Sequence, residues 1–330
     1  MELTTIDQRG LEVSSANALF MGKPFPSPIA QAGKSAVERF VEFFLVRIEN
    51  LNTRRAYGRA ALRFLNWMED HGLALEAVRP VHVAAYIESL KTELAAPSVK
   101  QQLASIRELF DWLVVGQIVP MNPASSVRGP KHSTNKGKTI DLSAADTRLL
   151  LDSIDTSHVR GLRDRALIAA LVYSCARVGA VVKMRVEDYY PKGKRWWFRL
   201  HEKGGKEHEV PAHHLAEAYL DEYIRTTGIS EDPKGPLFRS CKGRSSTLGT
   251  GGLEQSNVYQ MIRKRAIEAG IADKIGCHTF RATGITVFLK NGGDLETAQH
   301  MANHASARTT KLYDRRSDEI SLEAVERIWI

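Results

Sequence analysis

The sequence predicts a mainly α-helical protein of the α+β class, with a small β-hairpin or sheet and two domains. Three observations lead to this fold class. Four amphipathic helical patterns fill residues 34–120. A basic segment that contains prolines and glycines follows at 121–139. Beyond it helical patterns resume, but an alternation typical of paired strands occurs between residues 195 and 211. With 330 residues, the chain is long enough for two separate cores.

Residues 1–33 are predicted to form an irregular N-terminal arm. They show little hydrophobic periodicity, and five residues that break helices gather near their end: Gly22, Pro24, Pro26, Pro28 and Gly33. We therefore expect this arm to become ordered only on a binding partner or a neighbouring subunit.

The first domain, residues 34–120, is predicted to be a compact bundle of four helices. The first helical face comprises Val37, Phe40, Val41, Phe44, Leu45 and Ile48. The second follows Asn52, an expected N-cap, and comprises Tyr57, Ala61, Phe64, Leu65 and Met68. The third begins after Pro80, and the fourth after Pro97 and Ser98. The segments between the helices are short and contain glycine or proline, so the four helices are expected to pack into one domain.

The second domain, residues 140–316, begins with helices. Ser143 and Asp146 form a helix-start signal ahead of an apolar run. A second helical pattern covers 164–174, and a third begins near Val178. These helices precede the change to strand periodicity.

The strand-like segments 195–202 and 207–211 predict a β-hairpin with its tip at Gly204-Gly205. A helical pattern returns in HHLAEAYLDEYIRTTG, and residues 241–252 are predicted to be a surface loop. The helix VYQMIRKRAIEAG then leads into the last third of the domain. Residues 317–330 show one apolar helical face and predict a C-terminal helix.

The composition is that of a soluble globular protein, with 43% apolar and 25% charged residues. No apolar run approaches the roughly 20 residues of a membrane span, and the first residues lack the pattern of a secretory signal. The three cysteines, Cys175, Cys241 and Cys277, are far apart in the sequence and form no CxxC pair. This spacing favours a reducing compartment and gives no metal-site signal. We expect a cytoplasmic protein without a membrane partner.

The net charge of +8 favours a polyanionic partner. DNA or RNA fits better than a membrane, because no basic amphipathic anchor is visible. An ordinary basic protein is the alternative, which charge alone does not exclude. The candidate phosphate contacts lie on the helical domain and the linker: Arg54, Arg55, Arg59, Arg63, Lys100, Arg107, Arg128 and Lys131. Each alone is explained as well by a solvated face, but the cluster 54–63 is denser than solubility requires.

Residues near the end of the chain combine groups that act on an anion. His278, Arg281, His304 and Tyr313 lie within 278–313, without clustered carboxylates or cysteines. An arginine offers a planar fork to phosphate oxygens, and a histidine carries a proton near neutral pH. A tyrosine becomes a covalent nucleophile once its phenolate is stabilised. A lone HxxR match arises by chance about once in a chain of this composition, so order and spacing must support it.

The order and spacing of other residues support the HxxR match. Arg177 follows an apolar helix, and Lys203 stands at the predicted hairpin tip. With the HxxR pair, His304 and Tyr313, they complete the order R, K, HxxR, H and Y. In this order, the sequence resembles the tyrosine recombinase, or phage-integrase, family. HTFRAT resembles the family's HxLRHT box, and NHASARTTKLYDR its GHxSxxTTxxYxH box. The resemblance extends over nearly the whole chain, including the NPA linker at 122–124.

The resemblance implies an N-terminal core-binding domain, a C-terminal catalytic domain and a role for each site residue. Arg177 and Arg281 would clamp the scissile phosphate, and Lys203 would protonate the departing 5′-hydroxyl. His278 would handle the tyrosine proton, and His304 would donate a hydrogen bond to the phosphate. Tyr313 would be the nucleophile, and the 3′-phosphotyrosyl ester would conserve the bond energy. Neither a metal nor any other cofactor is then expected.

Four of these residues also have a structural explanation. Arg177 would serve as a helix-end cap, His304 as a buried hydrogen-bonded histidine, and Tyr313 as a core aromatic. For Lys203 the two explanations are nearly even, because Lys206 on the same turn is a rival. Jointly, order and spacing favour the functional explanation for the others.

Two positions depart from the family pattern. The family usually carries an acidic residue three positions after the first arginine, where this chain has Ala180. In the family, that acid is thought to orient the site. Its absence here therefore bears on the reaction rate or the geometry of the site more than on membership of the family. Two positions after Tyr313 stands Arg315 instead of the common histidine, and the sequence assigns it no role.

The resemblance further implies a double-stranded DNA partner and association with the nucleoid. It also implies a homo-oligomer, with a dimer on each site and a tetramer in synapsis, acting on a mobile element or replicon. The helix predicted at 317–330 would pack on its own domain or dock into a neighbouring subunit; we favour docking in trans. Two rival functions remain open at this stage. One is a type IB topoisomerase-like enzyme, and the other a catalytically impaired DNA-binding regulator of the same fold.

Overall fold

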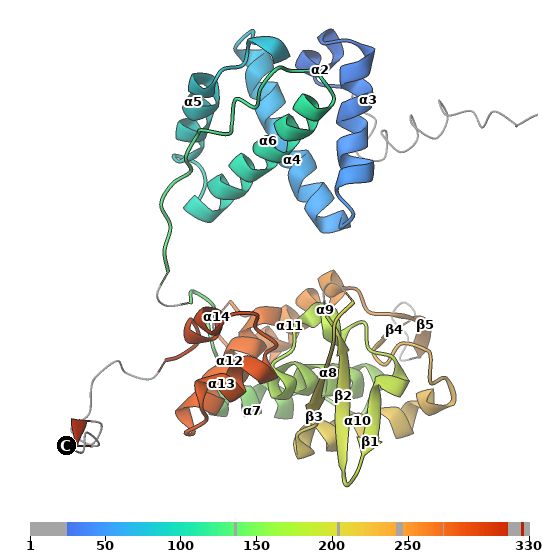
Figure 1. Cartoon of the computed structure of the whole chain (residues 1–330). Coiled ribbons are helices and arrows are strands. Elements are labelled where there is room, and N and C mark those ends of the chain that lie inside the picture. Colours follow the sequence, from blue (N-terminus) through green and yellow to red (C-terminus); the bar gives the residue numbers. More distant parts are fainter. Residues whose placement is uncertain are drawn as a thin grey trace, which may run out of the picture. The chain divides into compact units, whose positions relative to one another are not determined.

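The computed structural model describes residues 25–134, 137–202, 205–241, 247–272, 274–315 and 325–326. The chain folds into two compact units, Met1–Ser133 and Thr134–Ile330 (Figure 1). In the described residues, no helix combines the length and the apolar character that crossing a membrane requires.

The N-terminal unit is a helical bundle. Its helices are α2 Ser27–Gln31, α3 Lys34–Glu42, the π-helical turn η1 Phe43–Arg47, α4 Leu51–Asp70, the short 3-10 turn η2 Leu75–Ala77, α5 Pro80–Leu90 and α6 Ala96–Val115. Each of the four predicted stretches is helical, and apart from Leu45 the apolar residues of the predicted faces are buried in one cluster or pack against it. Aromatic rings fill its centre, with Phe64 packed against both Tyr86 and Phe110.

Three local predictions for this unit need correction. The arm is not irregular at α2, because Pro28 in the first turn is compatible with a helix start and Ile29 is fully buried in the core. The N-cap of α4 is Asn50, whose Oδ1 accepts from the backbone N–H groups of Asn52 and Thr53. The first long helix also changes to a π turn at Phe43, and both Phe43 and Phe44 are buried there.

The C-terminal unit combines helices with two small antiparallel sheets. Its helices are α7 Ala144–Asp152, α8 Val159–Ser174, α9 Val178–Val181, α10 His214–Thr227, α11 Gln255–Glu268, α12 Cys277–Lys290, α13 Leu295–Met301 and α14 Ala307–Lys311, with short 3-10 turns η3 Val186–Asp188 and η4 Ile229–Glu231. Its strands are β1 Tyr189–Lys192, β2 Arg195–His201, β3 Glu207–Pro211, β4 Arg239–Cys241 and β5 Leu248–Gly252. Ser143 caps α7 by accepting from the N–H of Asp146, as predicted.

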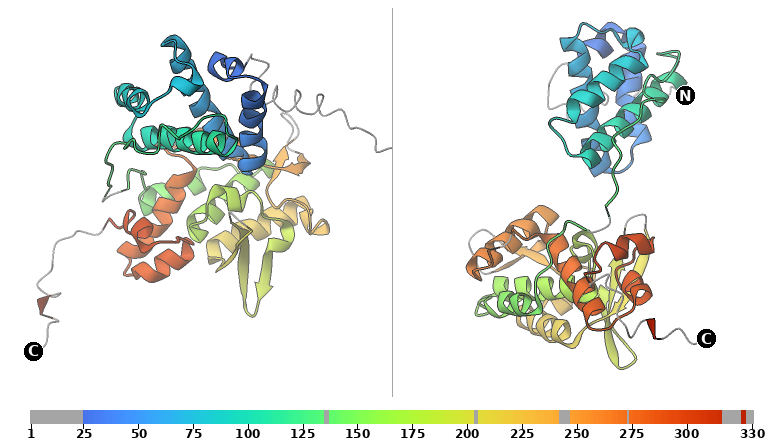
Figure 2. Two further views of the ribbon diagram at one scale, coloured as in Figure 1. Left: turned by 45° about the horizontal axis from the view of Figure 1, so that its top comes forward. Right: turned by 90° about the vertical axis from the view of Figure 1, so that its left-hand side faces the viewer.

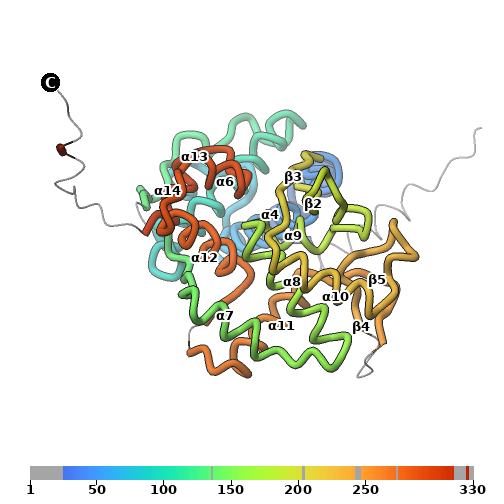
Figure 3. Tube along the Cα trace, turned by 90° about the horizontal axis from the view of Figure 1, so that it is seen from below, coloured from blue at the N-terminus to red at the C-terminus, as the bar shows by residue number. Residues whose placement is uncertain are grey.

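Helix α8 is the centre of this unit. It is buried on almost every face and packs against α10 and α12, as Figure 3 shows. The three-stranded sheet lies to one side of α8, and α12–α14 lie to the other (Figures 1 and 2). The run from Ala166 to Val172 is apolar on every face, which is typical of a position inside a core.

The predicted β-hairpin is confirmed: β2 and β3 pair antiparallel, with Phe198 opposite Val210. The N–H of Glu202 donates to the carbonyl of Lys206, so the ladder continues to the hairpin tip. The prediction of a plain surface loop at 241–252 is wrong, because Cys241 pairs with Leu248 in a second hairpin, β4–β5. Residues 242–246 lie outside the described part of the chain.

Candidate active site

Arg281 lies at the centre of the candidate site. Helix α12 starts at Cys277, so His278 and Arg281 lie in its first two turns on one face. Arg281 is only 2% exposed. Its Nη1 donates to the carbonyl of Cys175 at 2.6 Å, and its Nη2 to the carbonyl of Ala302 at 2.5 Å. These carbonyls precede Arg177 and His304 by two residues each, so Arg281 joins the three segments that carry the predicted site.

Arg177 is presented by the break between two helices. Helix α8 ends at Ser174, and its C-cap residue Cys175 takes the left-handed conformation, with φ of 53°. Arg177 then takes an extended conformation as the N-cap residue of α9. Its Nη1 donates to Oε2 of Glu202, the residue after β2, at 2.8 Å. The side chain of Arg177 is 43% exposed.

His304 precedes α14 in the chain, and Tyr313 follows it. Nδ1 of the buried His304 is 2.9 Å from Oγ1 of Thr310. The rings of His304 and Tyr313 are nearly parallel, at 7°, with centroids 5.8 Å apart. Oγ1 of Thr286 donates to the carbonyl of Tyr313 at 3.0 Å, which fixes the backbone of Tyr313 against α12.

The site holds positive charge in a partly buried space. Burial, and then the neighbouring charge of Arg177, lowers the pKa of Arg281, although an arginine stays charged in a protein. Burial and then the two arginines lower the pKa of His278 below its ordinary value. The same causes lower the pKa of His304 to about 4. Both imidazoles are therefore neutral at pH 7, and an entering anion would relieve the repulsion between the guanidiniums.

The low pKa of His304 predicts a loss of stability in acid. In an unfolded chain the histidine pKa is about 6.5, so the unfolded state takes up a proton first as the pH falls. The contribution of the neutral His304 to the free energy of unfolding is fully present above pH 6.5. It is lost as the pH falls to about 4, and the loss is roughly 3 kcal/mol at most. Urea unfolding of the full chain across this range checks this, with His304→Gln as comparison. The variant is expected to lose less stability in acid; parallel curves for the two proteins would contradict the account.

The sheet is tied to this site from two sides. Besides the contact of Glu202 with Arg177, Nε2 of His208 on β3 lies 3.2 Å from the carbonyl of Met301, next to Ala302. Lys203, the predicted general acid, lies outside the described residues, so its role stays a prediction. Its rival Lys206 is described and exposed.

Arg315, to which the sequence assigns no role, connects the Tyr313 segment to the end of the linker. Its Nη2 donates to the carbonyls of Gly137 at 2.8 Å and Thr139 at 3.0 Å. Its Nε lies 3.5 Å from the carboxylate of Asp141. The N–H of Gly137 donates to the carbonyl of Leu312 at 2.8 Å, and a Cβ on Gly137 would come within 2.8 Å of that oxygen. Only glycine fits this approach without a shift of the segment before Tyr313.

The predicted DNA contacts fall into two groups. Some have partners within the protein: Arg54 donates to the carbonyl of Ile48, Arg107 to those of Ala124 and Val127, and Arg63 pairs with Glu93. The others expose their side chains: Arg55, Arg59, Lys100, Arg128 and Lys131. DNA contact stays a prediction for all of them, and the exposed group is the better placed to make it.

Sequence reasoning missed Glu202, Arg315, Gly137 and Thr310 in this region. The sequence carries a weak signal for Glu202, an acid that precedes the hairpin lysine. No local pattern connects Arg315 with residues 137–141, which precede it by more than 170 positions. In the described residues, no group of three or more His, Cys, Asp or Glu side chains is placed to hold a metal ion.

The sequence matches two family descriptions. "Phage integrase family" covers residues 141–319, and "Phage integrase, N-terminal SAM-like domain" covers residues 37–116. The chain belongs to the phage integrase family. Its predicted family is thereby confirmed, and so is its activity as an enzyme that breaks and rejoins DNA strands.

Named relatives of this phage integrase family member are recombinases. Tyrosine recombinase XerD of Chlorobaculum tepidum is 28% identical over 290 residues, which cover 85% of this chain and 91% of the relative. Tyrosine recombinase XerC of Serratia marcescens is 24% identical over 292 residues, which cover 87% of this chain and 92% of the relative.

Solved structures of related fold confirm the predicted fold class. XerH site-specific recombinase in a post-cleavage complex with palindromic difH substrate has a TM-score of 0.71 at 18% identity, and the match covers 100% of this chain and 91% of that one. A lambda integrase tetramer bound to a Holliday junction has a TM-score of 0.64 at 18% identity, and the match covers 97% of this chain and 92% of that one.

Proposed function

We propose that this chain is a site-specific recombinase that cuts and rejoins double-stranded DNA through Tyr313, in the integration, excision or resolution of a mobile element or replicon. One observation carries the proposal: Arg281 hydrogen-bonds the segments that present Arg177 and His304, while the ring of His304 stacks on Tyr313. Residues distant in sequence thus form one anion site beside a tyrosine.

The geometry fits attack on a phosphodiester. The Tyr313 Oη attacks the scissile phosphorus and gives its proton to the neutral His278, whose pKa is lowered. Arg177 and Arg281 stabilise the doubly charged pentacoordinate phosphate with charge that needs no protonation step. The 5′-oxygen leaves with a proton, for which Lys203 is the proposed donor. Attack by the 5′-hydroxyl of another strand on the 3′-phosphotyrosyl ester reverses the step and rejoins the DNA.

Assembly of several protomers follows from the same proposal. The lambda integrase tetramer bound to a Holliday junction supports four protomers that act on two sites. A topoisomerase-like enzyme would share the chemistry but act as a monomer. A catalytically impaired regulator is disfavoured because Arg177, His278, Arg281, His304 and Tyr313 are all retained.

Capture of covalently bound DNA tests the proposed activity and reveals the target. The protein is incubated with sheared DNA of its source, denatured in detergent, and the DNA that stays attached is sequenced. Recovery of one recurrent sequence, with cleavage at a fixed position, supports a site-specific recombinase. Adducts without sequence preference would favour the topoisomerase-like alternative, and no adduct at all would contradict the proposed function.

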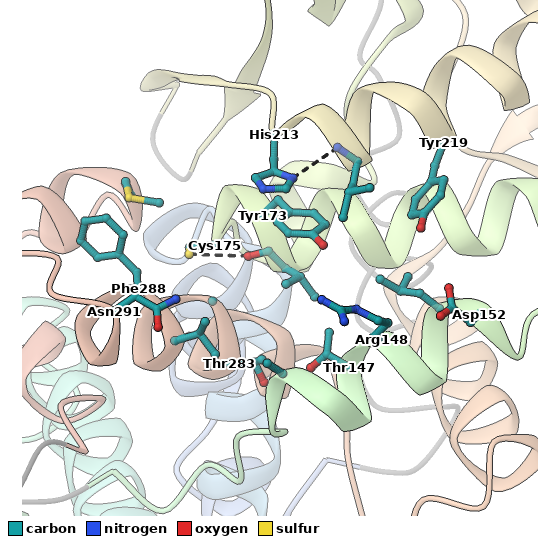
Figure 4. Close-up of a pocket in the computed structure, with 17 residues that line it drawn as sticks. Thr147, Arg148, Asp152, Tyr173, Cys175, His213, Tyr219, Thr283, Phe288 and Asn291 are labelled. Atoms are coloured by element: carbon teal, nitrogen blue, oxygen red, sulfur yellow. Dashed lines mark hydrogen bonds between the residues drawn. The ribbon is translucent and has the colours of Figure 1, made fainter.

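The C-terminal unit contains a cavity of about 570 Å³. It lies among α7, α8, α10 and α12 and is lined mainly by apolar side chains with Tyr173, His213 and Asn291 at its wall (Figure 4). Cys175, Phe288 and Met301 line it and also belong to the apolar cluster against which Tyr313 packs. We propose that residues 317–330 of a neighbouring protomer fill this cavity; the structure describes only 325–326 of this tail.

Deletion of residues 317–330 is expected to reduce assembly of four protomers on two sites by at least about tenfold, because an apolar helix that docks in trans supplies much of the contact energy. Binding of one protomer to DNA should change little. Mobility shifts with one and two DNA sites separate these effects. Val287→Glu, which places a charge in the cavity wall, should reproduce the defect. Normal tetramers from either variant would refute docking at this cavity.

A further inference from the structure

We propose that Glu202 is a positioning residue that holds Arg177 in the orientation needed to clamp the scissile phosphate, in place of the acid missing at position 180. The inference rests on the proposed function. It concerns a residue that neither the charge pattern nor the family motif identifies.

Glu202 is an acid inside a site built for an anion. Its side chain is only 6% exposed, and its Oε2 lies 2.8 Å from Nη1 of Arg177. Its charge also acts on Arg281, whose charged form it favours. A carboxylate here repels an entering phosphate and loses its hydration on burial. The repulsion of the phosphate and the lost hydration both disfavour a carboxylate at this position. We therefore expect the carboxylate to have a function that involves the arginines.

Orientation of Arg177 is the benefit that the geometry supports. Arg177 extends from a break between two helices and is 43% exposed, so its long side chain would otherwise sample many rotamers. An arginine side chain carries about 2 kcal/mol of rotamer entropy. A fixed carboxylate at one nitrogen removes part of that cost before substrate arrives and leaves the other donors for phosphate oxygens.

The structure explains why the acid comes from β2. Ala180 is three positions after Arg177, is buried in α9, and has only a methyl side chain, which accepts no hydrogen bond. Glu202 follows the last residue of β2, and α9 packs against this strand. The acid therefore reaches Arg177 from the sheet.

This arrangement couples the phosphate clamp to the hairpin. The N–H of Glu202 donates to the carbonyl of Lys206, which closes the tip that contains Lys203. One residue thus fixes Arg177 through its side chain and the base of the hairpin tip through its backbone.

Cleavage of two matched DNA substrates tests the proposal. One carries the normal scissile phosphodiester. The other carries a methylphosphonate at that position, where a neutral methyl group replaces a charged oxygen, so stabilisation by Arg177 matters much less. Both are nicked near the scissile bond so that the covalent adduct accumulates. Glu202→Ala, Glu202→Gln and Arg177→Ala are compared with the wild type, and Glu207→Gln serves as an exposed acid on the same hairpin.

Glu202→Ala is expected to slow cleavage of the phosphodiester by roughly ten- to hundredfold, less than loss of a preorganised donor itself. On the methylphosphonate its rate should lie within about threefold of the wild-type rate, and Arg177→Ala should follow the same pattern. Glu202→Gln, which keeps an acceptor oxygen, should lie between the wild type and Glu202→Ala. Glu207→Gln should cleave both substrates at the wild-type rate.

Two results would overturn the proposal. One is an unchanged rate of Glu202→Ala on the phosphodiester. The other is an equal slowing on both substrates, which would indicate a general structural role. Adduct formation by the wild type on the same gel reports on the proposed recombinase function, and the ratio of variant to wild type reports on Glu202. The two ideas can therefore fail separately.

Discussion

Tyr313→Phe will abolish the covalent protein–DNA adduct while DNA binding and thermal stability stay close to those of the wild type. The phenyl ring keeps the stacking on His304 and the packing on the apolar cluster around Leu289, so the fold loses little. The variant lacks the oxygen that attacks phosphorus. Loss of a covalent nucleophile costs on the order of 10⁴-fold or more in rate.

The measurement for Tyr313→Phe is adduct formation on a nicked substrate, with a mobility shift on the same DNA as the binding control. Tyr259→Phe, which removes the hydroxyl of an exposed tyrosine on α11, is the matched control and should form adduct normally. An adduct that persists in Tyr313→Phe would remove Tyr313 from the role of nucleophile.

Arg281→Lys will slow cleavage by on the order of 10³-fold and also destabilise the C-terminal unit. A lysine keeps the charge but has one nitrogen, which does not reach the carbonyls of Cys175 and Ala302 together and also face a phosphate. At least one buried carbonyl then loses its partner, at a cost of about 1–3 kcal/mol.

Arg177→Lys separates the chemical from the structural part of this effect. Arg177 is half-exposed and contacts a side chain, whereas Arg281 is buried and binds two backbone carbonyls. We expect Arg177→Lys to slow cleavage by about 10²-fold or more with little change in the urea midpoint. The account would be wrong if Arg281→Lys unfolded at the wild-type midpoint, or if the two variants lost stability equally.

The sequence predicted most of the helices, and it singled out five described candidate residues whose roles stay predictions, because both kinds of feature are encoded in local patterns. Apolar periodicity shows the faces of α4 and α6, and the HxxR spacing puts His278 and Arg281 on one face of α12. Two glycines between strand-like segments predicted the hairpin that β2 and β3 form. Such features depend on neighbours within a few positions.

What the sequence did not show depends on contacts between distant segments. Glu202 before a turn looks like a solvated acid until the fold brings β2 beside Arg177. Arg315 acquires its partners from residues 137–141, and no periodicity connects these segments. The prolines before α2 suggested an irregular arm, but burial of Ile29 in the core stabilises a helix there. Tertiary packing decided each of these cases.

The central claim is that Tyr313 forms a 3′-phosphotyrosyl bond with DNA. The most direct measurement is mass spectrometry of the trapped adduct after nuclease and trypsin digestion. Cleavage after Lys311 and Arg315 releases the peptide LYDR, with Tyr313 as its second residue. We predict that this peptide carries the nucleotide, joined through its 3′-phosphate to the phenolic oxygen. A nucleotide on any other peptide, or a bond through a 5′-phosphate, would contradict the account.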